Sequence, residues 1–223
     1  RMKRTLPFPL PDGDDALFCL VRHGETDWNR DKRIQGHLDV PLTDTGRRQA
    51  LAVRRALAGI PFAAHYASDL ARTLETARLI LGEDAPLQPH PGLRERHCGH
   101  FQGLLPEEAE RLDPQGYARY ASRDPHYRPP GGEALLETFT RIGRTLDELA
   151  RAHRGEAVLL VTHGGVLDAV RRHVEGLPLE RKRDFPIPNC GLSWVRWGQQ
   201  RAILAWAETS HLEAPARDEI AAM

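Results

Sequence analysis

Two histidines stand in similar local sequences, and imidazole can act as a nucleophile or bind an anion. One lies in Arg-His-Gly at positions 22–24, directly behind the apolar run 16–21. The other lies in His-Gly-Gly at positions 163–165, directly behind the apolar run 157–162. With 11 histidines in the chain, two His-Gly pairs alone are also compatible with chance. If both runs are strands of one parallel sheet, however, both imidazoles face one pocket at its carboxyl edge, where ligands bind.

Two charged residues add to this pattern. Arg72 lies in the first turn of an expected helix, two positions off its apolar face, and would point toward the same sheet edge. Glu95 stands between Arg94 and Arg96 at the start of an irregular segment. Alone, each has a simpler interpretation, since most charged side chains are solvated. Together with the two histidines, they would give one pocket two imidazoles, a carboxylate and guanidinium groups.

Short apolar runs alternate with segments of helical periodicity along the chain. This alternation predicts an α/β fold, a three-layer sandwich with a mostly parallel central sheet and helices on both faces. Thr43 is expected to cap the first helix, and Ser68 the second. Strands are expected at 16–21, 62–68, 86–90 and 157–163, helices at about 46–58, from Leu70 to Leu81, at 134–153 and after 164, and a final hairpin at 192–197 with 202–208.

Residues 95–133 break the alternation, because they are rich in Gly, Pro, His, Arg and Tyr and only 107–112 looks helical. Residues 30–45 are expected to be a loop. We therefore predict a single α/β domain over residues 1–223, with a small irregular or helical cap insertion at 96–133.

Composition excludes several classes of protein. Lys+Arg and Asp+Glu are both 31, so the chain lacks the basic excess of a general nucleic-acid binder. Three cysteines (Cys19, Cys98 and Cys190) are far apart and show no Cys-x-x-Cys spacing, which favours a reducing compartment. Prolines and aspartates interrupt the N-terminal segment, and no apolar run approaches the roughly 18 residues of a membrane span. We expect a soluble, cytoplasmic protein that binds neither nucleic acid nor membrane.

The sequence resembles the histidine phosphatase superfamily, in the branch that includes cofactor-dependent phosphoglycerate mutase. Arg-His-Gly alone would be a weak signal, but five motifs in the family's order, over about residues 16–170, are highly specific. They are LVRHGETDWN at 20–29, DVPLTDTGRRQA at 39–50, SDLARTLETA at 68–77, LRERHCGHFQG at 93–103 and VTHGG at 161–165.

This resemblance implies a role for each matching residue. His23 is implied to be the nucleophile that becomes phosphorylated, and Glu95 to be the proton donor to the leaving group. Arg22, Arg72 and His163 are implied to bind the phosphoryl oxygens. Further contacts with phosphate or within the pocket are implied for Asn29, Gln35, Gly36 and Gly164.

Phosphoryl transfer needs in-line attack and neutralisation of the phosphoryl oxygens. Arg22 and Arg72 can supply that charge as bidentate donors, so no metal and no other cofactor is expected. Neighbouring guanidinium groups should lower the pKa of His23 and keep it neutral. Glu95 would protonate the leaving alkoxide and then, as carboxylate, activate water to hydrolyse the phosphohistidine. We thus predict a metal-independent phosphomonoesterase that acts on a small phosphorylated metabolite and releases inorganic phosphate.

A cofactor-dependent phosphoglycerate mutase, which returns the phosphoryl group to a second hydroxyl, is the alternative. Residues 95–104 are similar to that branch. The mutases compared are longer, however, and carry a polar residue where this chain has Gly165. Residues 129–142 instead resemble the Gly-Gly-Glu segment of phosphatase members, with Ala134 in place of the usual Ser. These features favour the phosphatase. A sensor that has lost catalysis is disfavoured, because all the expected catalytic residues are present.

Specificity for the substrate is expected to reside in residues 96–133. Arginines there either bind a substrate carboxylate or are solvated: Arg119, Arg123 and Arg128. Aromatic residues either line a pocket or pack the cap: Trp28, Phe101, Tyr117, Tyr120 and Tyr127. The C-terminal hairpin either covers a sheet edge or forms the contact of a homodimer.

Overall fold

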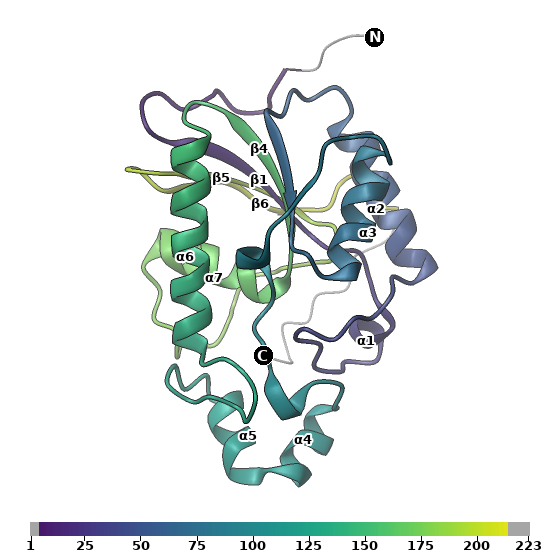
Figure 1. Ribbon diagram of the computed structural model, residues 1–223, viewed down its shortest axis with the longest axis vertical. Helices are drawn as coiled ribbons and strands as arrows, with labels where there is room; N and C mark the ends of the chain where they lie inside the picture. The colour runs from purple at the N-terminus through teal and green to yellow at the C-terminus, as the bar shows by residue number, and fades with distance from the viewer. Residues whose placement is uncertain (1–4, 214–223) are drawn as a thin grey trace.

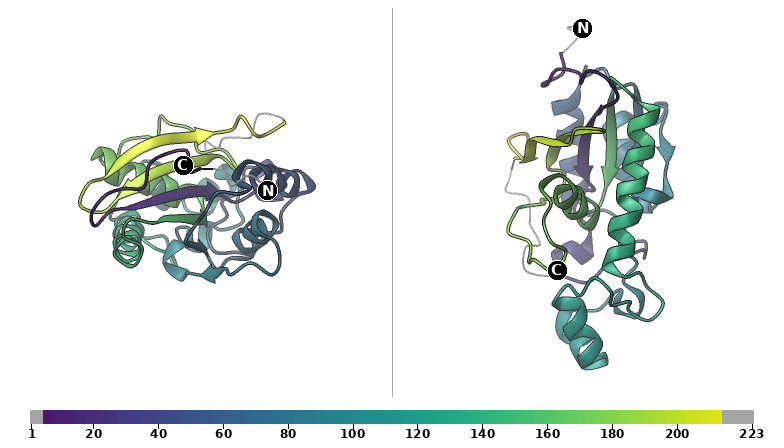
Figure 2. Two further views of the ribbon diagram at one scale, coloured as in Figure 1. Left: turned by 90° about the horizontal axis from the view of Figure 1, so that it is seen from above. Right: turned by 90° about the vertical axis from the view of Figure 1, so that its left-hand side faces the viewer.

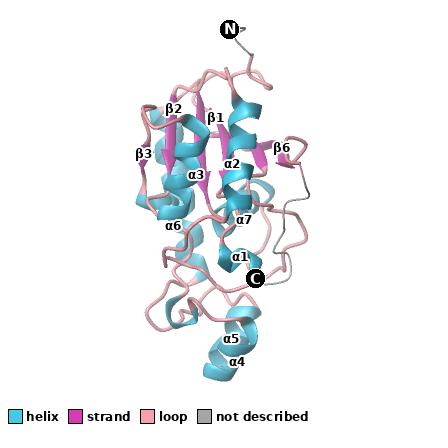
Figure 3. Cartoon of the chain, turned by 90° about the vertical axis from the view of Figure 1, so that its right-hand side faces the viewer, coloured by secondary structure: helices cyan, strands magenta, loops and turns pink. Residues whose placement is uncertain are grey.

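The structure, a computed structural model, describes residues 5–213, and within this range six strands form one mixed sheet. The strand order is β3-β2-β4-β1-β5-β6. The first four strands run parallel, whereas β5 is antiparallel to β1 and β6 is antiparallel to β5. Figure 3 shows β3 and β6 at opposite edges. The strands are β1 (Ala16–Arg22), β2 (Ala64–Ala67), β3 (Gln88–Pro89), β4 (Ala157–Thr162), β5 (Leu192–Trp197) and β6 (Ala202–Glu208).

Helices cover both faces of the sheet, which confirms the predicted three-layer arrangement (Figure 1). Successive residues of β1 point to opposite faces, so Leu17 and Phe18 belong to different cores. The core of Leu17 includes residues of α2 and α3, and that of Phe18 includes residues of α6 and α7. The four helices are α2 (Asp44–Leu57), α3 (Ala71–Leu81), α6 (Leu135–Ala152) and α7 (Gly164–Glu175).

The register of β1 and β4 determines where the chemistry lies. Both strands are buried along their whole length, as parallel strands covered on two faces are. Arg22 pairs with Thr162 at their carboxyl ends, and the His23 N–H donates to the Thr162 carbonyl at 2.9 Å. Each strand is therefore followed by its histidine at the same edge of the sheet, as the sequence predicted.

One of the two predicted helix caps is wrong. Thr43 caps α2, because its hydroxyl accepts from the Gly46 N–H at 3.0 Å. The N-cap of α3 is Leu70, which makes no capping hydrogen bond through its side chain. Ser68 lies two residues earlier, and its hydroxyl is 2.8 Å from Nε2 of His163. The Ser68 hydroxyl thus contacts His163 instead of providing the cap of α3 that the local sequence had predicted.

Residues 96–133 contain more helix than predicted. They hold η2 (Gly99–Phe101), α4 (Pro106–Leu112) and α5 (Pro114–Ala121), of which only α4 was expected. The Asp113 side chain caps α5 by accepting from the Gly116 N–H at 2.9 Å. Figure 1 and the right-hand view of Figure 2 place α4 and α5 beyond the carboxyl edge of the sheet.

Two short helices lie in the connections. A turn of helix, α1 (Asp27–Arg30), forms just before the predicted loop 30–45, and η1 (Pro91–Leu93) leads into the segment of Glu95. None of the helices in residues 5–213 combines the length and the apolar character that crossing a membrane requires.

Candidate active site

A cavity of about 80 Å³ lies beyond the carboxyl ends of β1 and β4, beside residues 96–133. It brings together four side chains that the sequence singled out, from three separate parts of the chain: Arg22, His23, Arg72 and Glu95. Gln35 and Gly36, for which the resemblance implies contacts with phosphate or within the pocket, line the same cavity. The remaining lining residues are Lys32, Arg33, Ile34, Arg96, Cys98, Tyr120, Arg123, Leu135, Thr138, Gly165 and Asp168.

The His23 ring has a defined orientation and tautomer. Its Nδ1 lies 2.8 Å from the Gly24 carbonyl, which can only accept, so Nδ1 carries the ring proton and Nε2 keeps its lone pair. Burial lowers the pKa of His23 well below its usual value, and the Arg72 and Arg22 charges lower it further. The predicted direction is correct, although burial outweighs the arginines. His23 is therefore a neutral imidazole whose Nε2 has no hydrogen-bond partner among residues 5–213.

Gly24 is the only residue type that fits after His23. A Cβ at this position would lie 2.5 Å from the Gly46 carbonyl oxygen, which belongs to the backbone of α2 and cannot move aside cheaply. The Gly24 N–H donates to the Thr76 hydroxyl of α3 at 3.0 Å. Close packing on two helices thus fixes the carbonyl that orients the His23 ring.

His163 lies against His23, with ring centroids 5.3 Å apart and planes at 61°. Its Nε2 contacts the Ser68 hydroxyl, and its Nδ1 is buried with no hydrogen-bond partner among the described residues. Burial lowers the pKa of His163 well below its usual value, and the nearby Arg72 lowers it further. His163 is thus a second neutral imidazole with one nitrogen committed to Ser68.

Backbone carbonyls hold both guanidinium groups in place. Arg22 donates from Nη1 to the Ile187 carbonyl at 2.7 Å. Arg72 donates to the Gly36 carbonyl at 2.7 Å and to the Leu38 carbonyl at 3.1 Å. Burial lowers the pKa of Arg72 to about 10, which still leaves it protonated at neutral pH. Two guanidinium groups, each held by backbone carbonyls, therefore stand beside the His23 ring.

The Glu95 carboxylate is held by two backbone donors. Its Oε1 accepts from the Arg96 N–H and its Oε2 from the Gly165 N–H, each at 2.9 Å. The Gly165 N–H lies in the first turn of α7, where free backbone donors attract a negative group. Gly165, which directly follows His163-Gly164, thus helps to fix the Glu95 carboxylate in the cavity wall.

Comparison with known proteins identifies the family. Residues 18–209 match the family described as "Histidine phosphatase superfamily (branch 1)". The chain belongs to this family. It is 39% identical over 212 residues to phosphoglycerate mutase-like protein 4 of Arabidopsis thaliana, covering 92% of this chain and 91% of that protein.

Two further similarities agree with this membership of the histidine phosphatase superfamily. The metal-independent phosphoserine phosphatase of Arabidopsis thaliana is 35% identical over 203 residues, covering 88% of this chain and 83% of that protein. The structure of YhfR from Bacillus stearothermophilus is 31% identical with a TM-score of 0.82, covering 88% of this chain and 99% of that one. The resemblance and the fold class predicted from the sequence are thereby confirmed.

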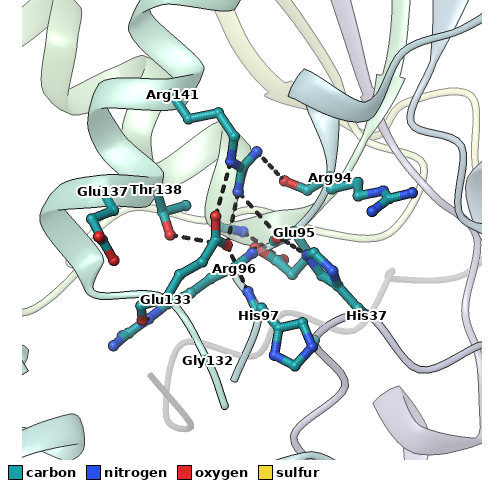
Figure 4. Close-up of polar contacts among 12 residues, drawn as sticks. His37, Arg94, Glu95, Arg96, His97, Gly132, Glu133, Glu137, Thr138 and Arg141 are labelled. Atoms are coloured by element: carbon teal, nitrogen blue, oxygen red, sulfur yellow. Dashed lines mark hydrogen bonds and ion pairs between the residues drawn. The ribbon is translucent and has the colours of Figure 1, made fainter. Parts of the chain in front are cut away.

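In this member of the histidine phosphatase superfamily, an ion pair supports the segment of Glu95 from behind (Figure 4). Arg141 of α6 donates to the carbonyls of Gly92, Arg94 and Glu95 at 3.0, 2.9 and 3.3 Å. It also binds Glu133, whose Oε2 accepts from the His97 N–H at 2.8 Å. Glu133 and Arg141 both belong to the segment 129–142 noted in the sequence, but no role was predicted for either side chain.

Asn29 and Gly164 were predicted to contact phosphate, but neither is among the described residues that line the cavity. The Asn29 Oδ1 accepts from the Thr26 N–H at 3.1 Å, which completes the cap of α1, and from Asn189 at 3.3 Å. Gly164 begins α7 next to Arg22. His163 is likewise behind the lining residues, against His23. Gly36 has a left-handed backbone (φ 60°) and presents its carbonyl to Arg72.

The arginines and aromatic residues predicted for the cap divide between cavity and packing. Arg123 and Tyr120 line the cavity. Arg119 and Arg128 pair instead with acidic residues at the surface, Asp124 and Glu137. Phe101 and Tyr127 form a small core with Ile34, Cys98 and Ala109, and Tyr117 packs against it.

Within residues 5–213, no group of three or more His, Cys, Asp or Glu side chains could hold a metal ion. His97 and Cys98, two possible ligand types that are adjacent in the sequence, make other contacts. His97 accepts from the Gly99 N–H at 3.0 Å, and the Cys98 thiol donates to the Arg96 carbonyl at 3.4 Å.

Proposed function

We propose that the protein is a metal-independent phosphomonoesterase that acts through a phosphohistidine on His23. The observation that carries this proposal is the neutral His23 ring, with its lone pair on Nε2, in one cavity with Arg22, Arg72 and Glu95. The arginines can neutralise the phosphoryl oxygens, which is the main requirement of phosphoryl transfer. The similar phosphoserine phosphatase, whose name describes it as metal-independent, supports the same chemistry.

In the first step, His23 Nε2 attacks phosphorus and forms the N–P bond as the ester P–O bond breaks. Glu95, as the carboxylic acid, transfers its proton to the leaving oxygen, and the alcohol departs. In the second step, the Glu95 carboxylate takes a proton from water, whose oxygen attacks phosphorus as the N–P bond breaks. Inorganic phosphate leaves, and both His23 and Glu95 return to their starting protonation states.

His163 is proposed to donate a hydrogen bond from Nδ1 to a phosphoryl oxygen. It is fully buried beside the nucleophile, and its Nδ1 lacks a partner among the described residues. A bound phosphoryl group would satisfy that nitrogen, which otherwise stays buried and unpaired at a cost of about 1–3 kcal/mol.

A trapping experiment tests the mechanism. Brief exposure to a ³²P-labelled aryl phosphate in the presence of a chelator should place acid-labile, base-stable label on His23, and His23→Ala should take up none. Turnover that survives in His23→Ala would exclude the phosphohistidine, and loss of all activity with the chelator would exclude metal independence.

A phosphoglycerate mutase remains the second candidate, since the first relative described above is named phosphoglycerate mutase-like. The two activities differ in what accepts the phosphoryl group from His23. Incubation with 3-phosphoglycerate and a 2,3-bisphosphoglycerate primer would produce 2-phosphoglycerate from a mutase, but inorganic phosphate and glycerate from a phosphatase. We expect phosphate release.

A further inference from the structure

The loop 34–38 contacts both Arg72 and the segment of Glu95. The carbonyls of Gly36 and Leu38 accept from the Arg72 guanidinium. His37 lies between these two residues in the chain, and its Nε2 is 2.7 Å from the Glu95 carbonyl oxygen. His37 is not among the described residues that line the cavity, so any effect on the reaction must pass through a neighbour.

The His37 side chain is a hydrogen-bond donor on a well-held loop. A carbonyl oxygen can only accept, so Nε2 of His37 carries the ring proton. Burial lowers the pKa of His37, although this hydrogen bond opposes the effect, so the ring is neutral at pH 7. The His37 N–H donates to Gln102 Oε1 at 2.7 Å, and Ile34 makes backbone hydrogen bonds with Gly103 and Leu104 at 2.7 and 3.0 Å. The loop therefore fixes the place of the donor.

The Glu95 carbonyl belongs to the same peptide unit as one of the donors that hold the Glu95 carboxylate. This unit joins Glu95 to Arg96 and is planar, so its C=O and its N–H rotate together. The N–H of Arg96 donates to Oε1 of Glu95 at 2.9 Å. A donor on the carbonyl thus orients the N–H that binds the carboxylate, and by polarising the peptide unit it also strengthens that hydrogen bond.

A second donor reaches the same carbonyl, but at a longer distance. Nη2 of Arg141 lies 3.3 Å from the Glu95 carbonyl oxygen, compared with 2.7 Å for Nε2 of His37 (Figure 4). The Arg141 guanidinium also binds two other carbonyls and the Glu133 carboxylate. His37 is therefore the shorter of the two contacts, and its Nε2–H is committed to this carbonyl alone.

Packing offers a simpler role for His37. Its ring lies against that of His97, with centroids 4.6 Å apart and planes at 62°. If His37 only filled this space, any side chain of similar size could replace it. The hydrogen bond to Glu95 instead requires an N–H, and this requirement distinguishes the two roles.

We propose that His37 is a positioning residue for Glu95, which orients the peptide unit between Glu95 and Arg96, and thereby the carboxylate, through its Nε2–H. This proposal rests on the proposed function, in which Glu95 gives its proton to the leaving oxygen as the P–O bond breaks. Arg72 is held through backbone carbonyls on either side of His37, so a change of the His37 side chain should leave phosphate binding intact.

Two substitutions of similar length test the donor. Gln and Met have side chains of similar size, but only Gln places an N–H near the position of the imidazole Nε2–H. We expect His37→Met to slow phosphohistidine formation from an alkyl phosphate about tenfold and from an aryl phosphate about twofold or less, because a phenolate leaves without full protonation. His37→Gln should stay within about threefold of the unaltered protein on both substrates, since it retains the donor.

A control variant and phosphate binding exclude general damage. His65 of β2 also contacts a backbone carbonyl, that of Pro86 at 3.0 Å, and does not line the cavity. His65→Met should therefore keep both rates, and inorganic phosphate should bind all four proteins with the same dissociation constant. Equal losses on the alkyl and aryl substrates in His37→Met, or equal rates for His37→Met and His37→Gln, would overturn the positioning role.

An amide resonance tests the same role without catalysis. In ¹⁵N-labelled protein, the Arg96 N–H resonance should move upfield in His37→Met, because its hydrogen bond weakens, and stay in place in His37→Gln. The Gly24 N–H, which donates to Thr76 elsewhere in the site, should not move in either variant. A protein that shows this shift but forms no phosphohistidine would contradict the proposed function and support the positioning role. An active protein in which neither the resonance nor the alkyl rate changes would do the reverse.

Discussion

The Gly165 N–H donates to Oε2 of Glu95 at 2.9 Å, and a Cβ on residue 165 would lie 2.1 Å from Oε1 of the same carboxylate. The contact is far shorter than any that real Cβ atoms make. Any side chain at position 165 must therefore displace Glu95. Gly165 acts on the chemistry through Glu95, both by donating a hydrogen bond and by leaving room for the carboxylate.

We expect Gly165→Ala to slow the first step on an alkyl phosphate by about 10²-fold, within the range attributed to a positioned general acid. The effect on an aryl phosphate should be smaller, since a phenolate leaves without full protonation. Rapid-quench measurement of phosphohistidine formation would report both rates. In a Glu95→Gln background the same substitution should have little further effect, and additive losses would show that Gly165 acts independently of Glu95.

The contact between Ser68 and His163 predicts a tautomer. The Ser68 hydroxyl oxygen already accepts from the Leu70 N–H at 3.4 Å, so the hydroxyl hydrogen can be donated to His163 Nε2. Because Nε2 then accepts, the ring proton of His163 is on Nδ1. We expect ¹⁵N NMR to show the Nδ1–H form of His163 and Ser68→Ala to shift the ring toward a mixture. Inorganic phosphate should bind about fivefold more weakly to Ser68→Ala, because a neutral hydrogen bond contributes about 1 kcal/mol. An Nε2–H tautomer in the unaltered protein would disprove this role.

The sequence predicted best those parts of the molecule that local pattern determines. Strands β1 and β4 are continuous apolar runs buried on both faces, so their position and the alignment of the two histidines followed from the pattern. Ser68 was assigned as a cap because serine favours that position, but its tertiary partner His163 is 95 residues away. Helix α5 was missed because Gly116 and its tyrosines are weak helix formers; its Asp113-Pro114 start was the available signal.

The residues of the candidate site also fall into those that local sequence predicted and those that it did not. The family motifs carried His23, Arg72 and Glu95, whereas Arg123 and Asp168 come from segments with no motif and meet only in the folded chain. Arg141 lies in the segment 129–142 that resembles phosphatase members, but no role was predicted for it, because its bonds to three carbonyls depend on where the segment before Glu95 passes over α6. Tertiary contacts of this kind leave no periodic trace in sequence.

Stability should fall in mild acid because His23 and His163 are buried as neutral rings. Both have pKa values well below the usual 6.5 in the folded state, so below about pH 6.5 the unfolded chain binds more protons and is favoured. Each ring should contribute a loss of about 1.4 kcal/mol per pH unit as the pH falls from there toward its folded pKa. Denaturant unfolding between pH 7.5 and 5 would measure the slope. His163→Gln should make it shallower, while the exposed His126→Gln should leave it unchanged.

The ion pair of Arg141 with Glu133 should control the placement of Glu95 more than the stability of the fold. Both side chains are about one quarter exposed, so breaking the pair should cost about 1–2 kcal/mol, less than a fully buried pair would. Arg141→Met removes the donors to the carbonyls of Gly92, Arg94 and Glu95 and should lower kcat on an alkyl phosphate about tenfold with little change in KM. Arg144→Met, on the same helix, is the matched control and should retain kcat.

The alternative is that Arg141 only stabilises α6. Arg141→Met would then unfold more readily but keep its kcat at temperatures where it is folded. Phosphate binding separates the two cases further. His23, Arg22 and Arg72 are held by the carbonyls of Gly24, Ile187, Gly36 and Leu38, so they should bind phosphate normally in the variant. A loss of phosphate affinity as large as the loss of kcat would show a general collapse of the cavity and would contradict a specific role in positioning Glu95.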